Sequence, residues 1–415
     1  MQPGNPVKPC QICGKVISSS NFSRHVNKHR DSDQKECAQC NTSVRSANWA
    51  RHIKSQKHLE QTASQSQLQS RSYILFADFI NTTEEPLTQL ASAYRREIAR
   101  AGGLSTLDSD ETSWTQLGIP APRLIPAAEC WGRVPSSMDE YKVDMLHHFD
   151  KSTTKIYCRG KPWTPLEDAP IHRVLSQLDQ PDVASALCAI NIRTQCAEVK
   201  LPERMSFDIY EDSLITETNI TPQFAGIDLH IDHGLNVITL LYGGCIKLWA
   251  LYPPTKQNYK RFKDVYSSHT MFVDLQNHLE GGKFCIQTEE QALYLPPGCI
   301  HSTYTLSGGF TLGTTFTTSA CLDIAASVAD LEKGMTRTGM GGDYSVFLRA
   351  VLMSLREQGE RQKEAMTLLC SRYAEISGLR PKPFTKLRSK LAKTCSICHR
   401  PWARHTSRWL TQSET

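Results

Sequence analysis

A chain of 415 residues is long enough for two or three domains and at least one large core. Hydrophobic residues make up 40% of it and charged residues 21%, which excludes a disordered or fibrous protein. Residues 1–60 contain ten basic and four acidic side chains, a net of +6 that exceeds the +5 of the whole chain. This local excess is expected of a module that binds a polyanion.

The 15 cysteines form CxxC pairs near the two ends of the chain, with single cysteines between them. The opening residues, MQPGNPVKPCQIC, lack the apolar segment that a secretory signal needs. We therefore expect a reducing compartment, in which these cysteines form metal sites and free buried thiols instead of disulfides.

Residues 1–60 repeat one arrangement of cysteine and histidine, C-x2-C-x11-H followed by x3-H or x5-H. Apolar residues recur at matching places, Ile17 and Val44 after the cysteines and Phe22 and Trp49 before the histidines. Two ligands from a turn and two from one helix face suit tetrahedral zinc, so we expect two small ββα units. The expected ligands are Cys10, Cys13, His25 and His29 for the first zinc ion, and Cys37, Cys40, His52 and His58 for the second.

These two units resemble two-Cys, two-His (C2H2) zinc fingers, and the resemblance implies DNA binding. Arginine pairs well with guanine and asparagine with adenine, so the residues implied to face a major groove suit base recognition. A finger pair that binds protein or RNA is the alternative. The implied DNA-facing residues are Ser18, Asn21, Arg24, Arg45, Asn48 and Arg51.

A polar, glutamine- and serine-rich stretch at 61–72 predicts a linker. The segment 73–129 is predicted to be helical, with one helix that has Pro86 in its first turn and ends at Gly102-Gly103. From 130 to 330, short β-branched and aromatic runs alternate with turn residues, and helical insertions such as 168–190 interrupt them. This pattern favours a β-sandwich or barrel with helices outside it, and an α+β multidomain chain overall.

The stretch LHIDHGLNVITLLYGGCIKLW (229–249) crowds polar side chains into an apolar run. If its strand continues, His230 and Asp232 share one face and His233 points away. A third ligand type, His301, follows a Pro-Pro-Gly turn at the start of another strand. Two histidines and a carboxylate form a facial triad that leaves positions of iron(II) open for chemistry. The apolar run is interrupted by Asn236, Lys247 and a Gly-Gly turn, so we expect two strands and no membrane span.

Four motifs in this region together resemble the Jumonji C (JmjC) family of iron- and 2-oxoglutarate-dependent dioxygenases. They are HID (230–232), KLWALYPP (247–254), YLPPGCIH (294–301) and GGFTLGTTF (308–316), within residues 200–320. The resemblance implies a double-stranded β-helix, a jelly-roll or cupin-like barrel. It also implies that His230, Asp232 and His301 bind Fe(II) and that Lys247 pairs with the distal carboxylate of 2-oxoglutarate, for which a fixed cation is needed.

Three positions bear on the cosubstrate. Lys247 comes about two residues later than the family motif places its lysine, so Cys245 competes for the aligned position. Asn236 matches a position that is often polar in the family. Ile227 stands where a hydroxyl or amide residue often holds the cosubstrate, so this role is expected to pass to Thr239, Thr311 or Thr315.

The segment 331–394 is expected to contain two amphipathic helices within 343–377, broken near Gly359, that pack on the barrel or pair two chains as a homodimer. A basic stretch at 380–393 suits nuclear targeting or phosphate contact, or is a solvated face. Residues 395–405 offer a possible third zinc site, with His399 or Cys370 as candidates for the fourth ligand. Its expected ligands are Cys395, Cys398 and His405.

The sequence thus predicts a nuclear dioxygenase that zinc fingers tether to DNA and that acts on a chromatin protein. Lysine demethylation on a histone tail is the first expectation, by association with DNA, and hydroxylation of a protein side chain is the second. The non-enzymatic alternatives are a catalytically inactive JmjC-fold, DNA-binding transcriptional regulator and a zinc-binding cupin without redox chemistry.

Overall fold

The computed structural model describes residues 7–11, 15–30, 34–37, 42–45, 48–55, 70–81, 89–107, 112–150, 153–158, 161–162, 171–205, 209, 214–266, 268, 270–333, 344–357 and 359–379. The chain divides into two compact units, residues 1–74 and 75–415. None of the helices within the described residues is both long and apolar enough to span a bilayer.

The first unit repeats a hairpin followed by a helix, which is the order expected from the sequence. Strand β1 (Val7–Pro9) pairs with β2 (Val16–Ser18) ahead of helix α1 (Ser19–Arg30). Strand β3 (Gln34–Cys37) pairs with β4 (Thr42–Arg45) ahead of α2 (Trp49–Ile53). Cys10 is buried at the end of the first hairpin, whose backbone closes from Cys10 N to Lys15 O at 2.8 Å.

The second unit is built on two antiparallel sheets, and its mixed architecture confirms the α+β class. The larger sheet has the strand order β5-β16-β13-β18-β11-β9-β7-β8, and the smaller one β12-β17-β14-β15. The strands of the larger sheet are β5 (Arg123–Pro126), β7 (Lys155–Cys158), β8 (Lys161–Pro162), β9 (Leu187–Arg193), β11 (Thr216–Thr221), β13 (Asn236–Tyr242), β16 (Gln291–Leu295) and β18 (Gly309–Phe316). Those of the smaller sheet are β12 (Gly226–His230), β14 (Ile246–Tyr252), β15 (Lys283–Gln287) and β17 (Ile300–Ser307).

The two sheets face each other, and side chains between them join the layers. Gln287 of β15 accepts a hydrogen bond from the Thr239 hydroxyl of β13 at 3.2 Å, and its amide donates to the Thr239 carbonyl at 3.0 Å. All seven residues of β14 are buried, because one face of this strand points at the opposite sheet and the other at a layer of helices. Burial on both faces explains why the strand is an almost continuous apolar run.

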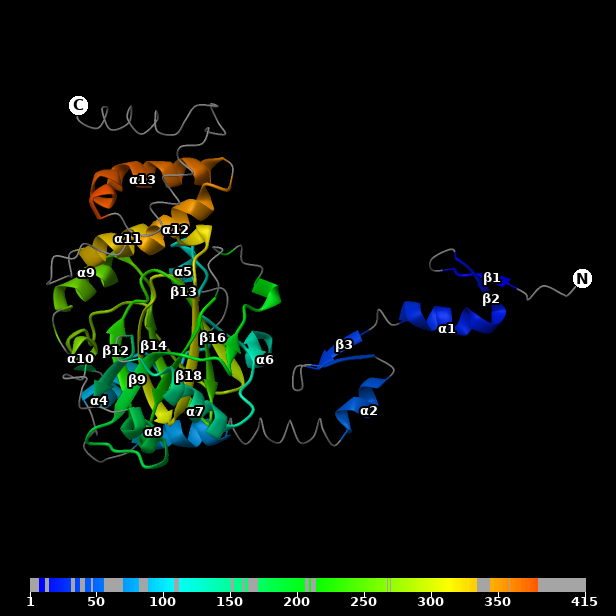
Figure 1. The fold of residues 1–415 in the computed structure, drawn as a ribbon, viewed down its shortest axis with the longest axis horizontal. Helices are drawn as coiled ribbons and strands as arrows, with labels where there is room; N and C mark the ends of the chain where they lie inside the picture. Colours follow the sequence, from blue (N-terminus) through cyan, green and yellow to red (C-terminus); the bar gives the residue numbers. More distant parts are fainter. Residues whose placement is uncertain are drawn as a thin grey trace, which may run out of the picture. The chain divides into compact units, whose positions relative to one another are not determined.

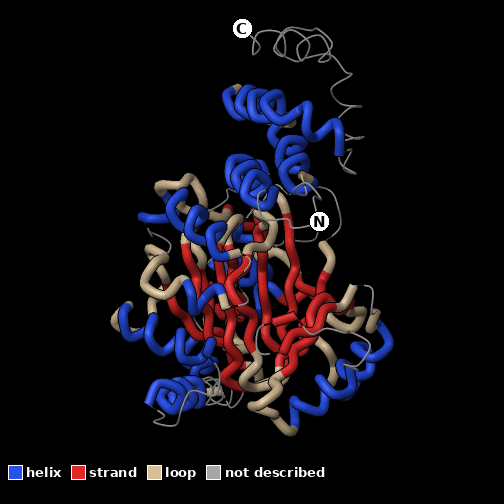
Figure 2. Tube along the Cα trace, turned by 90° about the vertical axis from the view of Figure 1, so that its left-hand side faces the viewer, coloured by secondary structure: helices blue, strands red, loops and turns tan. Residues whose placement is uncertain are grey.

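Helices cover the outer faces of both sheets, as Figures 1 and 2 show. Helix α4 (Gln89–Arg100) packs on the smaller sheet, where Tyr94 meets Phe284 at a ring-centroid distance of 6.4 Å. Helices α7 (Met138–His148) and α8 (Ile171–Asp179) cover the larger sheet, where Tyr141 meets Phe310 at 4.7 Å. Edge-on aromatic contacts of this kind add to the free energy gained by burying apolar area.

A helical layer lies at one end of the sheets (Figure 1). Helix α11 (Leu322–Lys333) packs against α12 (Ser345–Ser354) and α13 (Glu360–Leu379), and Arg372 of α13 pairs with Asp330 of α11 at 2.5 Å. The two predicted C-terminal helices are therefore confirmed, with Gly359 at φ +88° between them. They pack within their own chain, and pairing of two chains stays a prediction.

Two sequence predictions in this unit were wrong in part. The predicted helix 168–190 is α8 only as far as Asp179, and its end is strand β9 from Leu187. Strand β5, within the segment predicted to be helical, pairs with β16. Both strands are short, with β9 largely buried and β5 partly buried, and such short apolar runs do not distinguish a strand from a helix by periodicity. The predicted helix stop at Gly102-Gly103 is confirmed, with φ of +79° and +120°.

The turn before β17 is tightly packed around Gly298. Gly298 has φ +74°, and a methyl group added there would overlap Tyr259 Oη of helix α9 (Lys256–Val265) and Ile324 Cγ2. Gly102 has nearly the same φ, +79°, with nothing within 4 Å. Gly298→Ala should lower the free energy of unfolding by about 2–4 kcal/mol, and Gly102→Ala by about 1 kcal/mol. Urea denaturation measures both, and equal losses would show that the close packing contributes nothing.

Candidate metal centre

The two histidines of the candidate site lie on neighbouring strands of the smaller sheet. His230 is the last residue of β12 and is directly opposite His301, the second residue of β17. The turn Pro296-Pro297-Gly298 leads into β17 and is closed by Cys299 N donating to Pro296 O at 3.3 Å. The two imidazole rings lie 4.1 Å apart between centroids, so residues 71 positions apart in the sequence meet through sheet pairing.

Asp232 reaches the same point from a turn and not from a strand. Strand β12 ends at His230, so the expectation that His230 and Asp232 share a strand face was wrong. His233 and Gly234 have positive φ, +47° and +73°, and Leu235 N donates to Asp232 O at 2.8 Å. His233 is turned toward helix α11, with Nδ1 2.6 Å from Glu332 Oε1, and takes no part in the ligand group.

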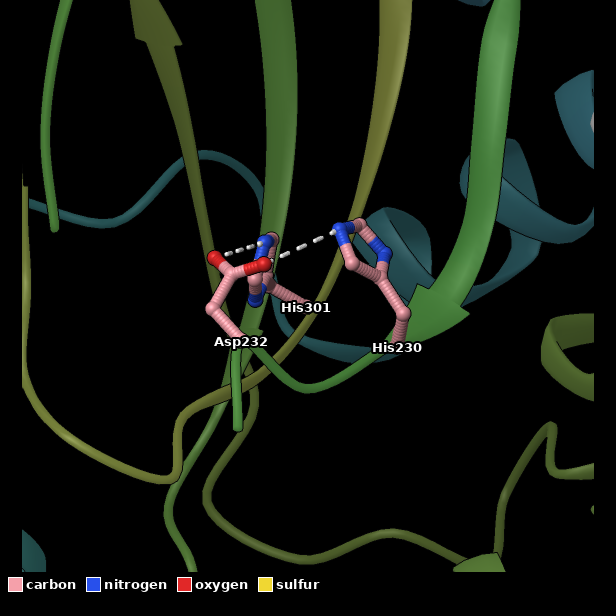
Figure 3. Close-up of side chains that lie close together, drawn as sticks. All are labelled: His230, Asp232 and His301. Atoms are coloured by element: carbon pink, nitrogen blue, oxygen red, sulfur yellow. Dashed lines mark ion pairs between the residues drawn. The ribbon is translucent and has the colours of Figure 1, made fainter. Parts of the chain in front are cut away.

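The three ligand atoms form one compact group (Figure 3). Asp232 Oδ2 is 3.4 Å from His301 Nε2, and Asp232 Oδ1 is 4.0 Å from His230 Nε2. All the ligand atoms lie within 4.8 Å of one another. Among the described residues this is the group of histidine, cysteine and acidic side chains that can hold a metal ion.

Backbone carbonyls orient both imidazoles. His230 Nδ1 is 2.9 Å from Asp228 O, and His301 Nδ1 is 3.1 Å from Cys299 O. A carbonyl only accepts, so each Nδ1 carries the proton and each Nε2 lone pair faces Asp232. Burial and the neighbouring His301 lower the pKa of His230 to about 4. A neutral imidazole is the form that binds a metal, so the donor set fits a divalent cation.

A cavity of about 650 Å³ opens from this group between the two sheets. It is lined by residues of both sheets, including Lys247 of β14. The pairing of β14 with β17 shifts between Ile246 and Lys247, an irregularity of the kind that redirects a side chain. Cys245 precedes the strand, is buried beside Thr221 (3.6 Å from Sγ to Oγ1) and does not line the cavity.

Lys247 is a buried cation without a counterion in the described part of the chain. It is 2% exposed and has neither an ion pair nor a hydrogen bond among the described residues. Burial lowers its pKa. The nearby thiols Cys188 and Cys245 do not neutralise it, since burial raises the pKa of each of them. A cation so placed favours an anionic ligand in the cavity.

Not all of the predicted cosubstrate residues line the cavity. Thr239, Thr311 and Thr315 line the cavity together with Ile227. Asn236 does not: its amide lies between the Tyr294 hydroxyl at 2.7 Å and Cys321 Sγ at 2.9 Å, which occupies its polar atoms.

Trp249 and Thr303 also line the cavity and were not among the predicted site residues. The signal was present in the alternation of IHSTYTLS, which puts His301 and Thr303 on one face of β17. Trp249 shares the inward face of β14 with Lys247 for the same reason.

Several of the predicted zinc ligands lie outside the described residues, whereas the predicted DNA-facing residues lie within them. Cys13, Cys40 and His58 lie outside the described residues, as do Cys395, Cys398, His399 and His405, so all three zinc sites stay predictions. Arg45 is the last residue of β4. The expected DNA-facing side chains that are exposed are Asn21 and Arg24 on α1, Asn48 before α2 and Arg51 in it.

Comparisons with known proteins do not assign the chain to a family. No model of a protein family matches the chain, and a search of curated proteins finds no match.

The buried charge of Lys247 leads to a stability prediction. Lys247→Met keeps the volume and removes an unpaired cation, so the ligand-free protein should gain about 1–4 kcal/mol at neutral pH. The lysine pKa is lowered on folding, so the folded wild type releases its proton first as the pH rises, and its stability increases toward the unfolded pKa. The advantage of the variant should therefore shrink at high pH. Thermal melts from pH 7 to 10 measure it, and a loss of stability in the variant would contradict an unpaired charge.

Proposed function

We propose that this protein is an Fe(II)- and 2-oxoglutarate-dependent dioxygenase of the JmjC type. The observation that carries the proposal is the shared cavity of the His230, Asp232 and His301 group and the buried Lys247. A metal-chelating dicarboxylate needs both features, a cation-binding triad at one end and a fixed positive charge at the other. A zinc-binding barrel without redox chemistry would use the triad and leave the charge of Lys247 without a partner.

The donor set supports iron as the metal. Two imidazoles and one carboxylate are typical of non-haem Fe(II) oxygenases, because three coordination positions stay available to cosubstrate and oxygen. Asp228 O and Cys299 O hold the imidazole rings in the tautomer that a metal needs. The two facing antiparallel sheets support the jelly-roll arrangement implied by the sequence.

When bound, iron and 2-oxoglutarate supply an oxidation in which O2 and 2-oxoglutarate yield succinate and CO2, and one oxygen atom enters a substrate C–H bond. The chain contributes binding and orientation: Lys247 fixes the distal carboxylate, the triad holds the metal, and the apolar walls around Trp249 and Leu295 exclude water. Hydroxylation of an N-methyl carbon gives an unstable product that releases formaldehyde, whereas hydroxylation of a side-chain carbon gives a stable alcohol.

The proposed substrate follows from the two N-terminal units that accompany the candidate catalytic unit in the same chain. The two N-terminal units support a DNA tether in the nucleus, because exposed asparagine and arginine side chains lie on their helices. A protein bound to chromatin, with a histone tail lysine first, is then the substrate within reach. Side-chain hydroxylation and a non-catalytic regulator are the alternatives that the assays below separate.

The activity is tested by product formation. Wild type with Fe(II), 2-oxoglutarate and O2 should release succinate and CO2, with formaldehyde in addition when a methylated histone peptide is the substrate. His230→Ala removes a metal ligand and should lower the rate at least a hundredfold. His278→Ala, an exposed histidine of the same unit, is the control and should match wild type. Equal inactivity of wild type and His230→Ala across a peptide panel would mean that the oxygenase proposal is wrong.

DNA binding has its own test. If the N-terminal units contact phosphates, the logarithm of the association constant for duplex DNA should fall linearly with the logarithm of salt concentration, by about 0.9 for each phosphate neutralised. Arg51→Ala should weaken binding and Asn21→Ala should relax sequence preference. Fluorescence anisotropy with residues 1–74 and with the full chain measures this, and an affinity independent of salt would favour a protein partner.

A further inference from the structure

The hydroxyl of Thr303 is a buried polar group without a partner. Thr303 is 4% exposed, and its Oγ1 has no hydrogen-bond partner among the described residues. It lines the cavity that holds the metal-ligand group and Lys247. Buried hydroxyls are normally hydrogen-bonded, and leaving one unpaired costs free energy, so a ligand that fills the cavity is expected to pair with it.

Strand pairing fixes where this hydroxyl lies. Strand β17 runs between β12 and β14, and Thr303 is opposite Ile227 on one side and Trp249 on the other. Lys247 is two residues from Trp249 on the same face of β14, so Thr303 is its diagonal neighbour across the strand pair. Side chains in this relation lie close enough to bind one small group together.

Two polar side chains close to Lys247, those of Trp249 and Gln287, are already engaged, whereas the hydroxyls of Thr305, directly opposite Lys247, and of Thr311 on β18 have no partner among the described residues. Trp249 Nε1 donates to Gln287 Oε1 at 3.0 Å. The Gln287 amide donates to Thr239 O and to Gln291 O, each at 3.0 Å. On the described inner face of the smaller sheet, Lys247 and Thr303 are thus cavity-lining donors whose acceptors must come from a ligand.

We propose that Thr303 donates a hydrogen bond to the distal carboxylate of the cosubstrate, beside the ion pair with Lys247. This inference rests on the proposed function, because it assigns a further residue to the same cosubstrate. A carboxylate has two oxygens and about four lone-pair sites, so one ammonium group cannot satisfy it in a buried place. Ile227, directly across from Thr303, offers no donor, and the hydroxyl is supplied from the neighbouring strand.

Cosubstrate affinity tests the proposal. Mn(II) replaces iron as a metal that does not turn over, and 2-oxoglutarate binding is measured by calorimetry. Thr303→Val is isosteric and should weaken binding about tenfold, whereas Thr303→Ser should stay close to wild type. The same variants are titrated with 2-oxobutanoate, which chelates metal identically but lacks the distal carboxylate. Its affinity should not change.

Thr305→Val is the matched control. Thr305 is also buried, has an Oγ1 without a partner and lies on the same strand face, but it does not line the cavity. It should bind 2-oxoglutarate like wild type. In the reverse direction, adding Ile227→Thr to Thr303→Val returns a hydroxyl to the opposite position and should restore most of the affinity. Because the Thr303 hydroxyl bonds to no described protein atom, the melting temperature of ligand-free Thr303→Val should not fall.

The outcomes are distinguishable. If wild type does not bind 2-oxoglutarate, the proposed function is wrong, and this inference with it. If wild type binds it and Thr303→Val binds equally well, or weakens 2-oxobutanoate to the same extent, only the role of Thr303 is overturned. A loss that Thr305→Val reproduces would also overturn it, since the effect would then come from the strand and not from the cavity.

Discussion

The buried ammonium group of Lys247 is the constraint around which the candidate site is organised. Removing a charge from water is costly, and either a counterion or a lowered pKa reduces that cost. Burial lowers the pKa of Lys247, and a ligand in the cavity could supply the counterion. Two sheets enclose the charge, and the neighbouring strand β17 carries both His301 and the unpaired hydroxyl of Thr303. The same cavity therefore brings together a group that could hold a metal ion and a buried lysine.

Antiparallel pairing explains how so few residues build both ends of this site. Strands β12, β17 and β14 lie side by side, and alternation puts His301 and Thr303 of β17 on the same inner face as Lys247 of β14. The outer faces of the same strands are apolar and are covered by helices, which keeps the sheet rigid. A rigid sheet suits a site whose groups must hold a fixed separation.

Asp232, the third candidate metal ligand, depends on a different part of the fold. Asp232 lies in a turn that Gly234 makes possible, and this glycine packs close to Ala325 of helix α11. His233 in the same turn contacts Glu332 of that helix. The helical layer α11–α13 therefore supports the loop that carries Asp232, besides burying its own apolar surface.

Local patterns in the sequence were sufficient for the α+β class, the helix that stops at Gly102-Gly103 and the two C-terminal helices, because these depend on residue type and on spacing along the chain. The expectation that Lys247 shares a site with His230, Asp232 and His301 came from the resemblance to a known family, and all four residues line one cavity. The tertiary structure decided four other features. Asp232 lies in a turn, and β9 is a strand where a helix was predicted. Asn236 bonds to Tyr294 and Cys321 instead of lining the cavity, and Thr303 lines it. The reason is physical: the partner that satisfies a buried polar atom comes from a strand or helix far away in the sequence, so no local pattern specifies it.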